Sequence, residues 1–185
     1  MKIYVTGLGV VSGIGLGVAE NIASLRKHQH GMGKVTLFPT ELDVPVSEVK
    51  YSNEELKRLL SLDIQKTFSR TALLGMLAAR EAVDDARLDL NTLRVGLISS
   101  TSVGGMDLSE HFYNAFKKDN RKGRLREVIS HDCGASTEMI ADYLKVNDFV
   151  TTISTACSSA ANAIMLGARM IRNCLLYTSP SPRDR

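Results

Sequence analysis

Two short apolar runs, each with helix-like segments before and after it, most constrain the fold of this chain. They are "RVGLISSTS" at 94–102 and "DFVTTIST" at 148–155. Runs of β-branched and small residues with few charges are typical of strands buried on both faces. Because helical segments separate the two runs, the strands would be joined by helical crossovers. The pattern predicts an α/β protein with a largely parallel sheet.

The remaining elements follow from helical spacing, caps and turn residues. The strongest helix is predicted at 66–88, which is rich in alanine and has apolar residues at helical spacing. Another is predicted at 52–63, where Ser52 or Asn53 can cap the first turn and acidic residues follow. A first strand is expected at 2–6 and 10–11, with a glycine-rich exit, and residues 29–52 read as a loop with one short strand. Further helices are expected at 17–28, 106–118, 136–145 and 157–172.

Composition sets outer limits on function. The 185 residues correspond to about one domain. A net charge of +3, mixed along the chain, gives no argument for nucleic acid. Three cysteines are an odd number without metal-type spacing, so we expect free thiols in a reducing compartment and no metal. No cofactor is expected either. No run is long enough for a membrane span, and "MKIYVTGLGVV" lacks signal-peptide features, so a cytoplasmic location is expected.

Cys157 lies where the second apolar run meets a helical segment. A helix N-terminus presents unpaired N–H groups and the positive end of the helix dipole, which stabilise a thiolate. The N–H of Cys157 could also form half of an oxyanion hole. The small neighbours of this cysteine, such as Ala156 and Ser158, permit a tight turn like the nucleophile elbow of hydrolases. A buried structural cysteine is the alternative that position alone leaves open.

Four sequence motifs follow one another along the chain: "VTGLGVVSGIG" at 5–15, "SRTALLGMLAAREAVDDA" at 69–86, "VGLISSTSVGGM" at 95–106 and "STACSSAANAIMLGARMI" at 154–171. Together they resemble the N-terminal half of a β-ketoacyl-acyl carrier protein synthase of the thiolase-like condensing-enzyme superfamily. The resemblance implies a layered α/β fold, the N-terminal half of a duplicated αβαβα architecture, truncated. It covers residues 1–173 as one incomplete domain.

The resemblance also implies a mechanism. The family's nucleophilic cysteine falls on Cys157, which would take an acyl group from a carrier protein or coenzyme A. Malonyl-acyl carrier protein would then lose carbon dioxide and attack that thioester in a decarboxylative Claisen condensation, in fatty acid, polyene or polyketide biosynthesis. The full-length form is expected to be a homodimer or a heterodimer with a related subunit.

The residues that complete this reaction are expected elsewhere. The family's two histidines and a second oxyanion N–H lie in the second half of family chains, so this fragment alone is expected to be inactive. The chain's own histidines match no family motif and receive no catalytic role; they are His28, His30, His111 and His131.

Two weaker sets of site residues are expected. Substrate-binding candidates flank the end of the first apolar run and the cysteine: Val103, Gly104, Gly105, Met106 and Ser158. The glycines fit simple turn positions as well. Cations near the start of the long helix could bind an acidic carrier protein, although a solvated helix face is the default explanation. They are Lys57, Arg58, Lys66 and Arg70.

Three other possibilities are weighed. A non-catalytic, chain-length-factor-like subunit is disfavoured because Cys157 is present. An NAD(P)-dependent reductase is disfavoured because the G-x-G of Gly7 and Gly9 is followed by Ser12, where the dinucleotide fingerprint needs glycine or alanine. The segment 174–185, "CLLYTSPSPRDR", resembles translated adapter sequence, so the native sequence is expected to end at about Asn173, with a disordered tail as the alternative.

Overall fold

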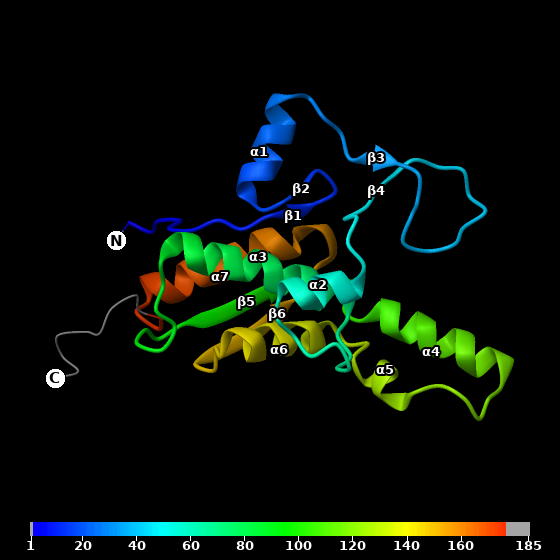
Figure 1. Ribbon diagram of the computed structural model, residues 1–185. Coiled ribbons are helices and arrows are strands. Elements are labelled where there is room, and N and C mark those ends of the chain that lie inside the picture. Colours follow the sequence, from blue (N-terminus) through cyan, green and yellow to red (C-terminus); the bar gives the residue numbers. More distant parts are fainter. Residues whose placement is uncertain (1, 177–185) are drawn as a thin grey trace. The chain divides into compact units, whose positions relative to one another are not determined.

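The structure is a computed structural model that describes residues 2–176 (Figure 1). Within this range the chain forms two compact units. One comprises residues 2–5, 67–72 and 88–176, and the other comprises residues 6–66 and 73–87. Most of the expected tail, residues 177–185, lies outside the described residues. None of the helices in the described range has the length and apolar content needed to cross a membrane.

The first unit is built on a parallel strand pair. β5 (Gly96–Ser100) pairs in parallel with β6 (Phe149–Ile153), with Ser100 opposite Ile153. These strands confirm the two apolar runs, although both are half-buried rather than fully buried. Three helical elements frame β6: α6 (Cys133–Leu144) precedes it, and the short 3-10 turn η1 (Ala156–Ser158) and α7 (Ser159–Arg172) follow it.

The helices α6 and α7 cover opposite faces of this pair. In α7, a Cβ added to Gly167 would lie 3.5 Å from Cδ1 of Ile98, whose strand partner is Thr151. The next residue of β6, Thr152, points the other way. Its hydroxyl donates a hydrogen bond of 2.6 Å to Thr137 of α6. The unit therefore has a helix–sheet–helix layering, which Figure 1 shows as α7 and α6 on either side of β5 and β6.

A helical hairpin joins β5 to α6. α4 (Met106–Lys118) matches its predicted range, whereas α5 (Leu125–Ile129) was not predicted. Phe112 stacks on Phe116 with ring centroids 5.7 Å apart, and Gly123 lies so close to Phe112 that a Cβ would approach its ring to 2.6 Å. The Nδ1 atom of His111 lies 3.2 Å from the buried carboxylate of Glu127. These contacts hold α5 against α4.

The second unit consists of α1 (Val18–Arg26), α2 (Asn53–Leu59) and most of α3 (Arg70–Ala86). The expected cap of α2 is present as a capping box. Glu55 N–H donates to the Ser52 hydroxyl, and the Glu55 carboxylate accepts from Ser52 N–H at 2.7 Å. The hydrogen bonds from Ser52 hold the pKa of Glu55 below its ordinary value. Two minimal antiparallel pairs complete the unit: β1 (Val11–Ser12) with β2 (Gly15–Leu16), and β3 (Met32–Gly33) with β4 (Val46–Ser47).

The strand predicted at 2–6 is wrong, because residues 2–10 form no strand. Carboxylates of α3 take the place of a neighbouring strand. The N–H of Leu8 donates to Asp85 at 2.9 Å, and the N–H of Val10 donates to Glu81 at 2.9 Å. The parallel sheet is present but small: the described residues hold one parallel pair of five-residue strands and two antiparallel pairs of two-residue strands.

Two glycines allow this N-terminal segment to lie directly on α3. A Cβ added to Gly7 would lie 2.2 Å from the carbonyl oxygen of Ala82, and one added to Gly9 would lie 1.9 Å from that of Ala78. Real side-chain atoms do not approach so closely, so only glycine fits at both positions. The G-x-G motif is thus explained by close packing on a helix.

Candidate active site

Cys157 lies in a sharp turn between β6 and α7. The helical run begins with η1 at Ala156, so Cys157 is its second residue and its N–H has no carbonyl partner within the helix. The cysteine is exposed, which removes the alternative of a buried structural thiol. All three cysteines are free thiols, as expected.

The residue before the cysteine has an unusual backbone conformation. Ala156 has a φ of 52°, in the left-handed region that residues other than glycine seldom adopt. The preceding Thr155 has a φ of −131° and a ψ of 42°, and the right-handed helical region is reached again at Ser158, where α7 is about to begin. The left-handed Ala156 lies between β6 and α7 and is followed directly by the exposed Cys157, an arrangement that resembles a nucleophile elbow.

The predicted substrate loop leaves the same edge of the sheet as this turn. β5 and β6 are parallel and in register, and Thr101 N–H donates to the carbonyl of Ile153 at 3.3 Å, just beyond the last pair. The segment 103–106 and the turn at Cys157 therefore both follow the carboxyl ends of parallel strands, where ligands bind in open α/β sheets. Ser158, the remaining substrate candidate, lies in the turn itself.

The two glycines of that loop are packing positions. Gly104 has a φ of 57°, and a Cβ added to it would lie 2.6 Å from the carbonyl oxygen of His131. A Cβ added to Gly105 would lie 1.9 Å from the carbonyl oxygen of Ser130. Both glycines are buried, whereas Val103 and Met106 are 52% and 53% exposed. Their side chains are the ones in this loop that are available to a ligand.

No histidine in the described range forms a hydrogen bond to Cys157. His111 pairs with Glu127, and Nδ1 of His131 lies 2.9 Å from the Ser109 hydroxyl. The other two, His28 and His30, line a shallow hollow in the second unit.

The four cations proposed for carrier docking differ in their exposure and in the groups that they already contact. The Lys57 ammonium donates to the carbonyls of Ile64 and Lys66, at 2.9 and 2.7 Å, and so stabilises the turn after α2. Arg58 lies 3.7 Å from Glu54 in an exposed i,i+4 ion pair. Lys66 is exposed, and Arg70 is the first residue of α3.

A second basic surface was missed at the tip of the α4–α5 hairpin. Lys or Arg occupies six of the ten positions in 117–126, and all six are exposed. Asp119 pairs with two of them, Arg121 at 3.5 Å and Lys122 at 3.8 Å. Counting charges in "KKDNRKGRLR" would have found this segment, which we call the basic tip.

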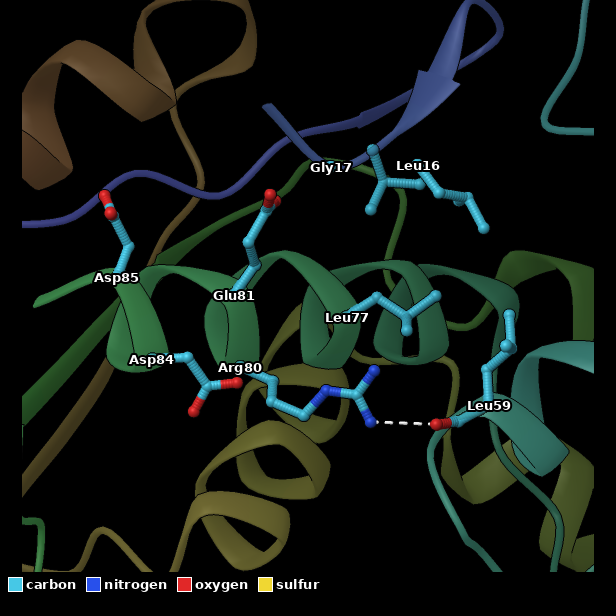
Figure 2. Close-up of a pocket in the computed structure, with 9 residues that line it drawn as sticks. Leu16, Gly17, Leu59, Leu77, Arg80, Glu81, Asp84 and Asp85 are labelled. Carbon is cyan, nitrogen blue, oxygen red and sulfur yellow. Dashed lines mark hydrogen bonds between the residues drawn. The ribbon is translucent and has the colours of Figure 1, made fainter. Parts of the chain in front are cut away.

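The glycine-rich N-terminal turn borders a cavity of about 440 Å³ in the second unit (Figure 2). Its polar lining comes from α3, and Glu81 closes the turn by accepting from Val10 N–H and from Val18 N–H at 2.7 Å. Asp84 and Asp85 also line the cavity, and Figure 2 shows Arg80 directed instead to the carbonyl of Leu59, at 2.8 Å. A dinucleotide would have to place its phosphates beside three carboxylates, which opposes the reductase interpretation.

The fold has close counterparts among solved structures. The ishigamide ketosynthase/chain length factor superposes with a TM-score of 0.80 and 25% identity, over 93% of this chain and 44% of that one. A thiolase-like condensing-enzyme fold is therefore the class that the layering and the cysteine turn define.

The family follows from the sequence comparison. The family described as "Beta-ketoacyl synthase, N-terminal domain" matches residues 1–174, and the chain belongs to it. It is 29% identical to 3-oxoacyl-[acyl-carrier-protein] synthase 2 of Vibrio harveyi, over 92% of this chain and 42% of the relative. It is 27% identical to putative polyketide beta-ketoacyl synthase 1 of Streptomyces halstedii, over 98% of this chain and 46% of the relative. The chain thus spans less than half the length of these relatives.

Proposed function

We propose that Cys157 accepts an acyl group from a thioester, the first half-reaction of a β-ketoacyl synthase. The observation that carries this proposal is the position of an exposed cysteine as the second residue of a helical run, directly after the left-handed Ala156. Membership of the β-ketoacyl synthase family supports the same assignment.

The step uses groups that this chain holds. The thiolate sulfur of Cys157 attacks the carbonyl carbon of the incoming thioester, and the resulting oxyanion accepts a hydrogen bond from the N–H of Cys157. The bond from that carbon to the original sulfur then breaks. The carrier or coenzyme A leaves as a thiolate that takes up a proton, and the acyl group stays on Cys157.

The second half-reaction, as the family resemblance implies it, consumes this intermediate. Malonyl-acyl carrier protein loses carbon dioxide, and the carbanion attacks the acyl carbon and releases the Cys157 thiolate. We propose that the histidines and the second oxyanion donor for this half-reaction belong to the portion of the relatives' length that this chain does not span. The proposed domain is residues 1–173, in a cytoplasmic protein.

The acyl chain is proposed to lie along the loop after β5. Val103 and Met106 expose apolar side chains at the sheet edge that carries Cys157, and Ser158 lies beside the cysteine. Buried Gly104 and Gly105 shape the loop. In one solved neighbour, the ketosynthase ApeO of Xenorhabdus doucetiae is in complex with its chain length factor. We propose that this protein likewise pairs with a second copy or a related subunit.

Acyl transfer is tested by incubating the chain with hexanoyl-N-acetylcysteamine and mapping the modified peptides by mass spectrometry. We expect the hexanoyl group on Cys157 and its loss in Cys157→Ala, while Cys133→Ala stays acylated. A folded chain that leaves Cys157 unmodified would refute the proposal and favour the non-catalytic subunit.

Carrier docking is proposed to use exposed cations. Arg58 and Lys66 represent the predicted patch, and Lys117 and Lys118 represent the basic tip. Two double charge reversals, Arg58→Glu with Lys66→Glu and Lys117→Glu with Lys118→Glu, separate the two surfaces. The reversal that slows acyl transfer from an acyl carrier protein, without slowing transfer from hexanoyl-N-acetylcysteamine, identifies the docking surface. If both variants accept the acyl group from the acyl carrier protein as fast as the unmodified chain does, docking at either surface is contradicted.

A further inference from the structure

The turn that presents Cys157 is held together by side chains. We propose that Ser159 and Asn162 are positioning residues that lock this turn and thereby fix the direction of the thiol and the N–H of Cys157. The inference rests on the proposed role of Cys157 as acyl acceptor and adds the residues that prepare it for that role.

Ser159 spans the left-handed residue. Its hydroxyl accepts a hydrogen bond from Thr155 N–H at 2.8 Å and donates one to the carbonyl of Ala156 at 2.7 Å. These two backbone groups stand on either side of the Ala156 φ angle, so one hydroxyl fixes both ends of the unusual torsion. Ser159 is 5% exposed, which leaves little water to replace it.

Asn162 supports the same turn from one helical turn further along α7. Its side-chain Nδ2 donates to the hydroxyl oxygen of Thr155 at 2.9 Å. The Ser158 hydroxyl adds a bond to the carbonyl of Thr155 at 2.8 Å. Thr155 is thus held through its N–H, its carbonyl and its side chain, and every partner comes from the first two turns that follow it.

These hydrogen bonds matter because the left-handed conformation is unfavourable for alanine. If the side chains that hold it were removed, Ala156 would relax toward ordinary torsions. That change would redirect the N–H of Cys157 away from the position at which an oxyanion forms. A reaction that builds an oxyanion on the acyl carbon would slow, whereas simple alkylation of the thiol, which forms no such oxyanion, would be affected far less.

The test compares two reagents on the whole chain: hexanoyl-N-acetylcysteamine, which acylates, and iodoacetamide, which alkylates. The variants are Ser159→Ala and Asn162→Leu, with Ser159→Thr retaining the hydroxyl and Ala161→Ser as a matched change on the exposed surface of α7. Each variant that loses its hydrogen bonds should acylate Cys157 about fivefold to tenfold more slowly. Its alkylation rate should stay within about twofold, because that reaction does not use the N–H. Ser159→Thr should recover the rate, and Ala161→Ser should not change it.

Cys133 and Cys174 serve as references within each molecule. A variant that unfolds would expose Cys133, which is half-buried in the folded chain, and would accelerate its alkylation relative to that of the exposed Cys174, so such a variant is recognised directly. Asn162 is only half-buried, which makes its replacement the safer of the two for folding. Unchanged acylation in a folded Asn162→Leu chain, or an equal loss with both reagents, would overturn the positioning role. Failure of the unmodified chain to acylate at all would instead refute the acyl acceptor.

Discussion

Replacement of Gly9 by alanine should destabilise the second unit strongly. The new Cβ would lie 1.9 Å from the carbonyl oxygen of Ala78 and 2.9 Å from the nitrogen of Ala82, both rigid helix backbone. Overpacking of this kind costs about 1–3 kcal/mol. The segment can relieve it only by moving off α3, which stretches the hydrogen bonds from Leu8 and Val10 to the carboxylates; hydrogen bonds to charged groups contribute about 1.5–3 kcal/mol each. We therefore expect a loss of about 3 kcal/mol.

The assay is urea unfolding followed by far-ultraviolet circular dichroism, with a thermal melt alongside. A loss of about 3 kcal/mol corresponds to a fall in Tm of about 6–12 °C for a chain of this size. Gly33→Ala is the matched control, because nothing lies within 4 Å of the Cβ it would add. If Gly9→Ala and Gly33→Ala unfold at the same urea concentration, close packing of the N-terminal segment on α3 is refuted.

Three further predictions concern other parts of the chain. The Thr36 hydroxyl, ahead of Lys50 and the Thr36 N–H, lowers the pKa of Glu48 to about 2. The contribution of Glu48 to stability is therefore complete above pH 4.5 and is lost as the pH falls toward 2, and Thr36→Val should weaken this pH dependence of the unfolding free energy while the bonds from Lys50 and from the backbone remain. Thr137 is 1% exposed, so Thr152→Val should lower the free energy of unfolding by about 1–3 kcal/mol, because the buried Thr137 hydroxyl loses its partner. If Thr137→Val combined with Thr152→Val costs as much as the two single replacements added together, the pairing is contradicted. Gly123 has a φ of 111° and lies against the Phe112 ring, so Gly123→Ala should speed trypsin cleavage at the basic tip, and an unchanged rate would contradict this packing.

The sequence predicted the helices and the parallel pair because their residues carry periodic signals. α3 and α4 fall on or within the predicted ranges, and the Ser52 cap follows a local rule that needs only four consecutive residues. The short α5 was missed, since five residues are too few to show a helical period. The helical conformation of α5 is stabilised instead by contacts with α4, such as the pairing of Glu127 with His111.

The failed prediction of a first strand shows where such reasoning ends. "KIYVT" has high β-propensity, but propensity does not say which groups will satisfy the backbone. In the structure the N–H groups of the following residues are taken by Glu81 and Asp85, which lie 71 and 77 residues away from their donors. No local pattern encodes a partner at that distance.

The cysteine turn and the N-terminal segment solve the same physical problem in different ways. In both, backbone N–H groups outside regular structure donate hydrogen bonds to side chains. At the cysteine turn the partners are local: Ser159 and Asn162 lie four and seven residues after Thr155, a helical spacing that can be read from "TACSSAAN". The conformation of the turn is thus specified by the stretch that contains Cys157, so a short motif is enough to point to the proposed site, whereas the backbone partners of the N-terminal segment lie too far along the chain for any local pattern to reveal.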